Sequence, residues 1–326
     1  MEEIRVGSAV STAAGVSTGE LRTGDMPDGA PITIPVVILR GETDGPTLWL
    51  NGCVHGDELC GTYIIHEVLR TVAPGDLTGT IVAMPLLNVT ASQKVQRMSP
   101  FELFGNGDLN RCFPGDPGGL TTQQMAHHIY GPLKQYADFL IDFHTALTID
   151  VRWALYADAP GEVGRKAAGI AKAFGYKSTL PAPIDILGGS AMMTAARDGI
   201  PSFIVEAGGM GAAFDRAVVE DAAERLRNVM RHLGMLQGAV TDYGAQYGFS
   251  NFAWVNSTRG GLFENYVKCG DRLEVGTKLG RYFDVFGDVV EEPESPCAGI
   301  VLAINNGPVM PTGVVLVHIG LDPQNV

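Results

Sequence analysis

Short apolar segments alternate with amphipathic segments through the first 240 residues or so, and this alternation limits the folds open to the chain. The apolar segments, each of which predicts a β-strand, are residues 32–41, 47–54, 79–87, 139–144, 152–157 and 202–208. The amphipathic segments, each of which predicts a helix, are residues 58–72, 121–136, 161–174, 190–198 and 213–235. Strands and helices in alternation are typical of an α/β fold with a largely parallel sheet between helices. We therefore predict such a domain over residues 1–240.

The sequence changes character after about residue 245. Helical periodicity is lost, Gly and Val become frequent, and short apolar runs such as AGIVLAI and GVVLVHIG are separated by turn residues. This pattern predicts a small all-β domain, which we place at residues 241–326.

Charge and cysteine content narrow the partners and the compartment. The chain has 23 Lys and Arg against 36 Asp and Glu, a net charge of −13, which opposes binding to nucleic acid or to anionic membrane surfaces. No run is long enough to span a membrane. Five scattered cysteines without a C-x-x-C pair fit a reduced cytoplasm better than a disulfide framework. We expect a cytoplasmic protein with a small-molecule partner, and the sequence leaves a homo-oligomer open.

Three predicted strands end in an unusual polar residue. LWLNGCV leads into His55, FLIDF leads into His144, and SFIVE ends on Glu206. A single histidine or glutamate in such a place is usually a structural residue. The carboxyl ends of parallel strands, however, form the ligand crevice of open α/β sheets. If these strands are parallel neighbours, the three side chains reach one edge and form a candidate site.

His55 and Glu58 have the spacing H-x-x-E, which can direct an imidazole nitrogen and a carboxylate at one point. A histidine from another segment would complete the His₂Glu set of catalytic zinc sites. Asp57 is an alternative carboxylate, although its position suits a supporting role better. Gly56 lets the chain turn tightly between them, and Cys53 beside the motif is more typical of a buried free thiol than of a zinc ligand.

A second polar cluster lies in the segment GNGDLNRCFPG, residues 105–115. Gly and Pro bracket Asn110 and Arg111, so a loop presents a cation and an amide. An arginine pairs with a carboxylate through two parallel hydrogen bonds. The simpler interpretation is a turn with a surface ion pair, but the nearby candidate metal site favours substrate binding.

These motifs together resemble a known family. HGDE with His55 and Glu58, DLNR with Asn110 and Arg111, DFHT with His144 and VEAGG with Glu206 are similar, in this order, to the succinylglutamate desuccinylase and aspartoacylase family of zinc carboxypeptidase-like enzymes. The resemblance covers residues 30–235. It implies a carboxypeptidase-like fold, in which the largely parallel sheet between helices is mixed. In the second domain it implies a β-sandwich similar to biotinyl and lipoyl domains.

The resemblance also implies roles for individual residues. His55, Glu58 and His144 match the ligands of one zinc ion per chain, and Glu206 matches the general base and acid. Asn110 and Arg111 match the substrate-binding pair. Family members have another arginine upstream of this pair, and here Arg97 and Lys94 are the candidates, with Arg97 taken as the match.

The motifs therefore predict a zinc-dependent hydrolase that cleaves the amide bond of an N-acyl amino acid or a related small amide. A zinc carboxypeptidase acting on peptides is the nearest alternative, and it would need an open cleft rather than a closed pocket. An alternative of another class is a protein that binds a metal or metabolite without turnover. Such a protein has no need of the general base Glu206.

Overall fold

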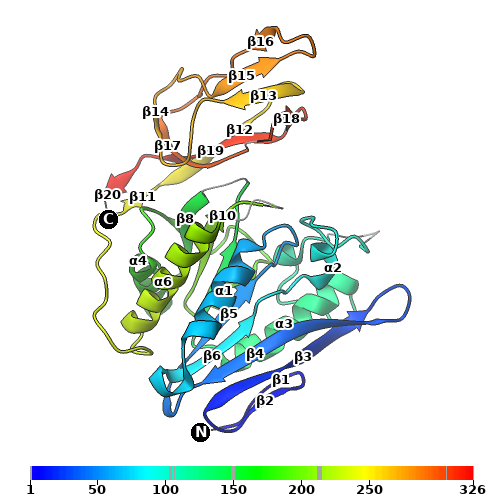
Figure 1. Ribbon diagram of the computed structural model, residues 1–326, viewed down its shortest axis with the longest axis vertical. Helices are drawn as coiled ribbons and strands as arrows, with labels where there is room; N and C mark the ends of the chain where they lie inside the picture. Colours follow the sequence, from blue (N-terminus) through cyan, green and yellow to red (C-terminus); the bar gives the residue numbers. More distant parts are fainter. Residues whose placement is uncertain are drawn as a thin grey trace.

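Ten strands form a single twisted sheet in the part of the chain that the computed structural model describes, residues 2–102, 105, 107–147, 151–210, 215–305 and 307–325 (Figure 1). In spatial order they are β20 (Gln324–Asn325), β11 (Tyr247–Gly248), β9 (Ser178–Pro183), β8 (Val151–Asp158), β10 (Ser202–Gly208), β7 (Phe139–His144), β5 (Thr43–Gly52), β6 (Thr78–Met84), β4 (Pro31–Arg40) and β3 (Gly15–Asp25).

The centre of this sheet is parallel and its flanks are mixed. Strands β6, β5, β7 and β10 run parallel, and β8 pairs antiparallel with β10 but parallel with β9. Strands β3 and β4 add an antiparallel edge. A short hairpin of β1 (Ile4–Val6) and β2 (Ala9–Ser11) lies beside it. The predicted fold class, a mixed and largely parallel sheet between helices, is confirmed.

Helices cover both faces because side chains alternate along each central strand. In β5, Leu48 and Leu50 face α1 (Cys60–Thr71), α4 (Glu162–Phe174) and α6 (Arg216–His232), whereas Trp49 faces α3 (Thr121–Tyr136). The shorter helices are α2 (Val89–Ser92) and α5 (Ala191–Arg197), with 3₁₀ turns η1 (Pro74–Asp76) and η2 (Leu109–Arg111). Burial on both faces explains why the central strands read as continuous apolar runs.

Two four-stranded antiparallel sheets form the C-terminal β-region (Figure 1). One has the order β12 (Asn251–Asn256), β19 (Val315–Leu321), β17 (Gly299–Ile304), β14 (Arg272–Leu273), and the other has the order β16 (Val289–Glu291), β15 (Gly280–Phe283), β13 (Gly261–Asn265), β18 (Val309–Met310). Tyr282 of one sheet and Val317 of the other share a core. Phe249, Ile300 and Leu302 pack with Trp153 and Leu155, which joins the β-region to the main sheet.

The sequence prediction missed several strands, most of them short or at the edge of the sheet. Strands β1, β2, β3 and β9 were not predicted, and the helix predicted from residue 58 begins at Cys60. Among the residues that the structure describes, no helix is long and apolar enough to cross a membrane.

Candidate active site

The carboxyl ends of β5, β7 and β10 bring the predicted polar residues together. Strand β7 pairs in parallel with both β5 and β10, so these three strands end at the same edge. His144 is the last residue of β7 and lies opposite Glu206 of β10 in the register. His55 follows the end of β5 by three residues. The crevice of an open α/β sheet lies at this edge.

The loop between β5 and α1 holds His55 and Glu58 in a turn. The amide of Glu58 donates to the carbonyl of His55 (3.1 Å), so Glu58 sits in the turn and precedes the helix. Gly56 is buried, and a Cβ there would lie 2.2 Å from the carbonyl carbon of Ala91 in α2. Close packing against α2 therefore requires glycine at this position.

Three buried side chains converge on one point. The Nδ1 atoms of His55 and His144 lie 2.8 and 2.9 Å from the two carboxylate oxygens of Glu58 and 3.2 Å from each other. One donor atom from each residue lies within 4.8 Å of the others, as a shared metal ion requires. The backbone amide of Thr145 donates to Glu58 Oε2 (3.0 Å) and fixes the carboxylate.

Each histidine contacts a second carboxylate through its other ring nitrogen. His55 Nε2 lies 3.1 Å from Asp108 Oδ1, and His144 Nε2 lies 3.2 Å from Asp142 Oδ2. A neutral imidazole that donates from Nε2 to a carboxylate directs the Nδ1 lone pair at the common point. Two such lone pairs and the Glu58 carboxylate then face one another, an arrangement that a cation between them satisfies. The residues present therefore fit a metal ion of the zinc type.

The charges of this cluster act strongly on one another. Burial by itself would raise the pKa of Glu58, but the two histidines outweigh burial and hold this pKa well below its ordinary value. Burial would likewise lower the pKa of His144, but the charges of Asp142 and Glu58 raise it above the ordinary value. The cluster thus keeps Glu58 ionised, which is the state that binds a metal.

Glu206 has the properties of a general acid–base group. Burial, followed by repulsion from Glu58, raises its pKa to about 7. Its Oε2 atom is buried and has no hydrogen-bond partner in the described part of the chain. A carboxyl group with a pKa near the working pH can both accept and donate a proton.

The basic residues lie at two depths. Arg97 contacts Glu58 Oε1 through Nη1 (3.3 Å) and Asp108 Oδ2 through Nη2 (3.1 Å). Arg111 is exposed and donates to the carbonyl of Asn110 (2.8 Å). Both arginines line the cavity described below, whereas Lys94 does not. Arg97 therefore sits beside the metal-ligand candidates and Arg111 at the rim.

Asn110 is held between two elements. Its Nδ2 lies 3.4 Å from His144 Nε2, and its Oδ1 accepts from the amide of Ala191 at the start of α5 (3.2 Å). The amide oxygen is thus already committed to the fold, and Nδ2 is the atom that faces the metal-ligand candidates.

Cys53 and Asp57 have supporting positions. Burial, with repulsion from Glu58, raises the pKa of the Cys53 thiol to about 12, and its Sγ donates to the carbonyl of His55 (3.3 Å). Cys53 has a φ of 56°, an unusual value for a residue other than glycine. Burial also raises the pKa of Asp57, which lines the cavity. Neither residue belongs to the group that can share a metal ion.

These residues border a cavity of about 400 Å³. Part of its wall comes from the C-terminal β-region, through Phe252, Trp254 and His318. The sequence analysis missed these residues and the partners Asp108 and Asp142. Asp142 carried a usable signal, because residues two apart in a strand point to the same face. The β-region residues carried no such signal, since they reach the site only through packing between distant segments.

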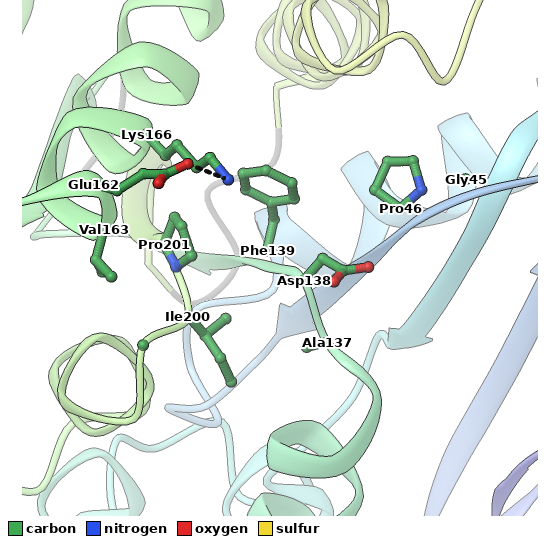
Figure 2. Close-up of a pocket in the computed structure, with 11 residues that line it drawn as sticks. Gly45, Pro46, Ala137, Asp138, Phe139, Glu162, Val163, Lys166, Ile200 and Pro201 are labelled. Carbon is green, nitrogen blue, oxygen red and sulfur yellow. Dashed lines mark ion pairs between the residues drawn. The ribbon is translucent and has the colours of Figure 1, made fainter.

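A larger hollow, of about 670 Å³, lies at the amino ends of the same three strands (Figure 2). Its lining includes Pro46, Phe139 and Pro201, with an ion pair between Glu162 and Lys166 (2.9 Å). The group of potential metal ligands lies at the opposite end of the strands. Size alone therefore does not identify the site, and the chemistry lies in the smaller cavity.

Comparison with known proteins identifies the family. A sequence model of the succinylglutamate desuccinylase/aspartoacylase catalytic domain matches residues 44–233. The chain is 31% identical over 291 residues to an N-alpha-acetyl-L-2,4-diaminobutyric acid deacetylase of Halomonas elongata, with 84% of this chain and 81% of that protein covered. The chain belongs to the succinylglutamate desuccinylase/aspartoacylase family, a family of deacylases, as the motifs predicted.

Solved structures agree with this assignment. The ectoine utilization protein EutE (DoeB) from Ruegeria pomeroyi, in a product-bound structure, is 26% identical with a TM-score of 0.84, and the match covers 95% of this chain and 96% of that one. A succinylglutamate desuccinylase/aspartoacylase from Rhodobacter sphaeroides is 25% identical with a TM-score of 0.81 and the same coverage.

Proposed function

We propose that this protein is a zinc-dependent deacylase that hydrolyses the amide bond of an N-acyl amino acid or a related small amide. The observation that carries the proposal is the convergence of two Nδ1 atoms and the Glu58 carboxylate in a cavity that also contains Glu206. Binding a metal requires only the first three groups. Glu206 adds the proton-transfer group that hydrolysis needs.

His55, Glu58 and His144 would hold one zinc ion per chain. When bound, zinc supplies Lewis acidity toward a carbonyl oxygen and lowers the pKa of a water molecule to about 7. Asp108 accepts a hydrogen bond from His55 Nε2, and the Asp142 carboxylate lies beside His144 Nε2, so the two acids fix the orientation of the rings.

The remaining residues move protons and bind charge. Glu206 takes the proton of the attacking water and later donates it to the leaving amine. Arg97, next to Glu58, stabilises the negative charge that develops on the carbonyl oxygen. Arg111 at the rim binds a carboxylate of the substrate, and the adjacent Nδ2 of Asn110 donates a further hydrogen bond.

The cavity favours a small substrate over a peptide. A carboxypeptidase needs a cleft through which a chain can pass, whereas here Phe252, Trp254 and His318 of the β-region close one side. The raised pKa of Glu206 argues against a protein that only binds a metal, because a carboxyl group of that pKa serves proton transfer.

The relatives suggest the first compounds to try. The Halomonas elongata protein is an N-alpha-acetyl-L-2,4-diaminobutyric acid deacetylase, so N-acetyl amino acids are the starting class. The proposal includes a cytoplasmic location, which the five free cysteines support. A small molecule remains the proposed partner, and assembly with further copies of the chain remains open.

The test combines metal content with amine release. The purified chain and its Glu206→Gln variant are assayed for zinc by mass spectrometry and for turnover of a panel of N-acyl amino acids. We expect about one zinc in both proteins and a rate in the variant lower by about 10² to 10⁴. If neither protein binds zinc after metal is supplied, the proposal is wrong. If zinc binds and only peptides are cleaved, the carboxypeptidase alternative replaces it.

A further inference from the structure

The active-site cavity continues sideways from Glu206 toward the β-region. Glu206 of β10 lies opposite Trp153 of the antiparallel neighbour β8, so the two side chains share one face of the sheet. The ring of Trp153 lies 5.4 Å, centroid to centroid, from that of His318. His318 in turn stacks on Trp254 of the adjacent strand, with 3.8 Å between centroids and 1° between planes. An unbroken row of contacts thus leads from the acid–base group to the β-region.

Four rings form the end of this row, and we call Trp153, Phe252, Trp254 and His318 the aromatic subsite. Phe252 meets His318 edge to face, at 5.1 Å between centroids. All four residues line the same cavity as the metal-ligand candidates. The adjoining row is aliphatic, because Ile204, Leu155 and Leu180 lie opposite one another on β10, β8 and β9.

The aromatic subsite is uncharged. His318 is buried, and both of its ring nitrogens lack a hydrogen-bond partner in the described part of the chain, as does the indole nitrogen of Trp153. Burial lowers the pKa of His318 to about 3, so the ring is neutral at physiological pH. A charged ligand group placed here would lose its hydration and gain no counter-charge.

The charged residues of the cavity belong to its other half. The acids among its lining are Asp57, Glu58 and Glu206, and the arginines are Arg97 and Arg111. All five come from the segments that form the candidate metal site and its rim. The cavity is therefore divided into two halves. The charged half would bind the scissile amide and a carboxylate of the substrate, and the half beyond Glu206 is apolar.

We propose that the aromatic subsite determines substrate specificity by binding an uncharged apolar group of the substrate. The favoured substrate is then an N-acyl amino acid in which the side chain or the acyl group is aliphatic or aromatic. A side chain with a free ammonium or carboxylate is disfavoured. This inference rests on the proposed deacylase function and adds the class of substrate to it.

Two substrate series test the inference. In the first, N-acetylglycine is compared with the N-acetyl derivatives of leucine, phenylalanine, aspartate and 2,4-diaminobutyrate. In the second, N-acetylglycine is compared with N-butyrylglycine and N-benzoylglycine. We expect kcat/KM to rise about tenfold or more toward the apolar members of at least one series, the range that one well-placed apolar group gives. If the rise is in the first series, the two charged N-acetyl amino acids should fall below leucine and phenylalanine.

Substitution of Trp254 ties the preference to the aromatic subsite. Trp254 is 47% exposed, so Trp254→Ala should fold, which a melting curve checks. We expect this variant to lose most of the preference for apolar over small substrates. The matched control is Phe286→Ala, which removes an 89% exposed aromatic ring elsewhere in the β-region and should leave the preference as it is.

A binding measurement separates this inference from the proposed function. Calorimetry gives the Kd of N-benzoylglycine and of N-acetyl-leucine, which needs no turnover. If no N-acyl compound is hydrolysed, the proposed function fails, but a Kd raised about tenfold in Trp254→Ala and not in Phe286→Ala still supports the aromatic subsite. Turnover with no rise toward the apolar members of either series, or a Trp254→Ala variant with the original preference and Kd, overturns the inference alone.

Discussion

His55 Nδ1 and His144 Nδ1 lie 3.2 Å apart, and each histidine has its Nε2 against a carboxylate. If both rings donate from Nε2, their Nδ1 lone pairs point at each other and at the Glu58 carboxylate, an arrangement that a cation between them stabilises. The spacing is therefore a feature of the candidate metal site rather than of an ordinary histidine contact. It also decides which ring nitrogen each histidine offers to a metal, and the predictions about metal binding depend on that orientation.

Removal of one of these imidazoles should remove the metal. We expect His144→Ala to lose both zinc and activity, whereas Glu206→Gln loses activity alone. His128→Ala is the matched control, because His128 is an exposed histidine of α3. Metal content by mass spectrometry after dialysis checks this. Stoichiometric zinc in His144→Ala would remove His144 from the ligand set.

The contact between Asp108 and His55 should affect metal affinity without supplying a ligand. Asp108→Asn keeps the shape of the side chain but weakens its hydrogen bond with His55 Nε2. Loss of such a supporting contact lowers metal affinity about 10- to 100-fold. Asp116→Asn, at an exposed turn of the same loop region, should leave the affinity unchanged. Competition with a chromogenic chelator measures both. Equal zinc affinity in the two variants would show that Asp108 does not orient the ligand.

Arg111 at the rim should contribute to substrate binding. Loss of a charged hydrogen bond of about 1.5 to 3 kcal/mol predicts that Arg111→Ala lowers kcat/KM about 10- to 100-fold. Zinc content should not change, since Arg111 contacts none of the three metal-ligand candidates among the described residues. Arg22→Ala, at an exposed ion pair in β3, is the control. Steady-state kinetics decide the matter, and identical values for Arg111→Ala and Arg22→Ala would exclude Arg111 from the site.

Much of the charged half of the site was accessible from the sequence because it follows from local rules. His55, His144 and Glu206 each follow a strongly apolar run, and parallel strands that lie side by side end at a common edge. Asp108 was visible in the loop segment, but its contact with His55 spans 53 positions and depends on how the loop folds back. Local pattern carries no information about such a contact.

The aromatic subsite could not be predicted from sequence patterns. Trp254 and His318 are cross-strand neighbours from β12 and β19, and they reach Trp153 only because the β-region packs on β8. Strand β3 was missed for a different reason: as an edge strand with few buried residues it lacks the apolar run that marks a strand. The division of the chain at residues 240 and 241 remains a prediction.

Gly56 should be sensitive to the smallest substitution. A Cβ at this position would lie 2.2 and 2.3 Å from backbone atoms of Ala91 and Ser92, which cannot move aside as a side chain could. We expect Gly56→Ala to destabilise the fold by about 1 to 3 kcal/mol and to weaken zinc binding by displacing His55. Gly131→Ala in α3, where the new methyl group meets open space, should be neutral or stabilising. Urea unfolding of both variants is the measurement, and equal stabilities would contradict the packing argument.

His318 should make the protein less stable as the pH falls. Its pKa is about 3 in the folded chain because of burial, whereas the ordinary value of 6.5 applies when the chain unfolds. Between these values the unfolded state binds the proton and the folded state does not, so unfolding becomes more favourable. Above pH 6.5 the ring is neutral in both states and the full stability of the fold is present. As the pH falls through this range, His318 lowers the free energy of unfolding by up to about 1.4 kcal/mol per pH unit.

The variant His318→Phe isolates this contribution, because it keeps a flat ring between Trp254 and Trp153 but cannot take up a proton. The rings around His318, those of Trp153, Phe252 and Trp254, do not titrate in this range. Other groups titrate equally in both proteins, so the difference between their free energies of unfolding reports His318.

Near pH 7.5 the variant should be at least as stable as the original chain, since a phenyl ring leaves no buried nitrogen without a partner. From about pH 6.5 to 4.5 the difference should grow in favour of the variant by about 2 kcal/mol. Urea unfolding at a series of pH values measures it, and a difference that stays constant would mean that His318 takes up its proton as readily in the folded chain as in the unfolded chain, so that the aromatic subsite becomes charged below about pH 6.5.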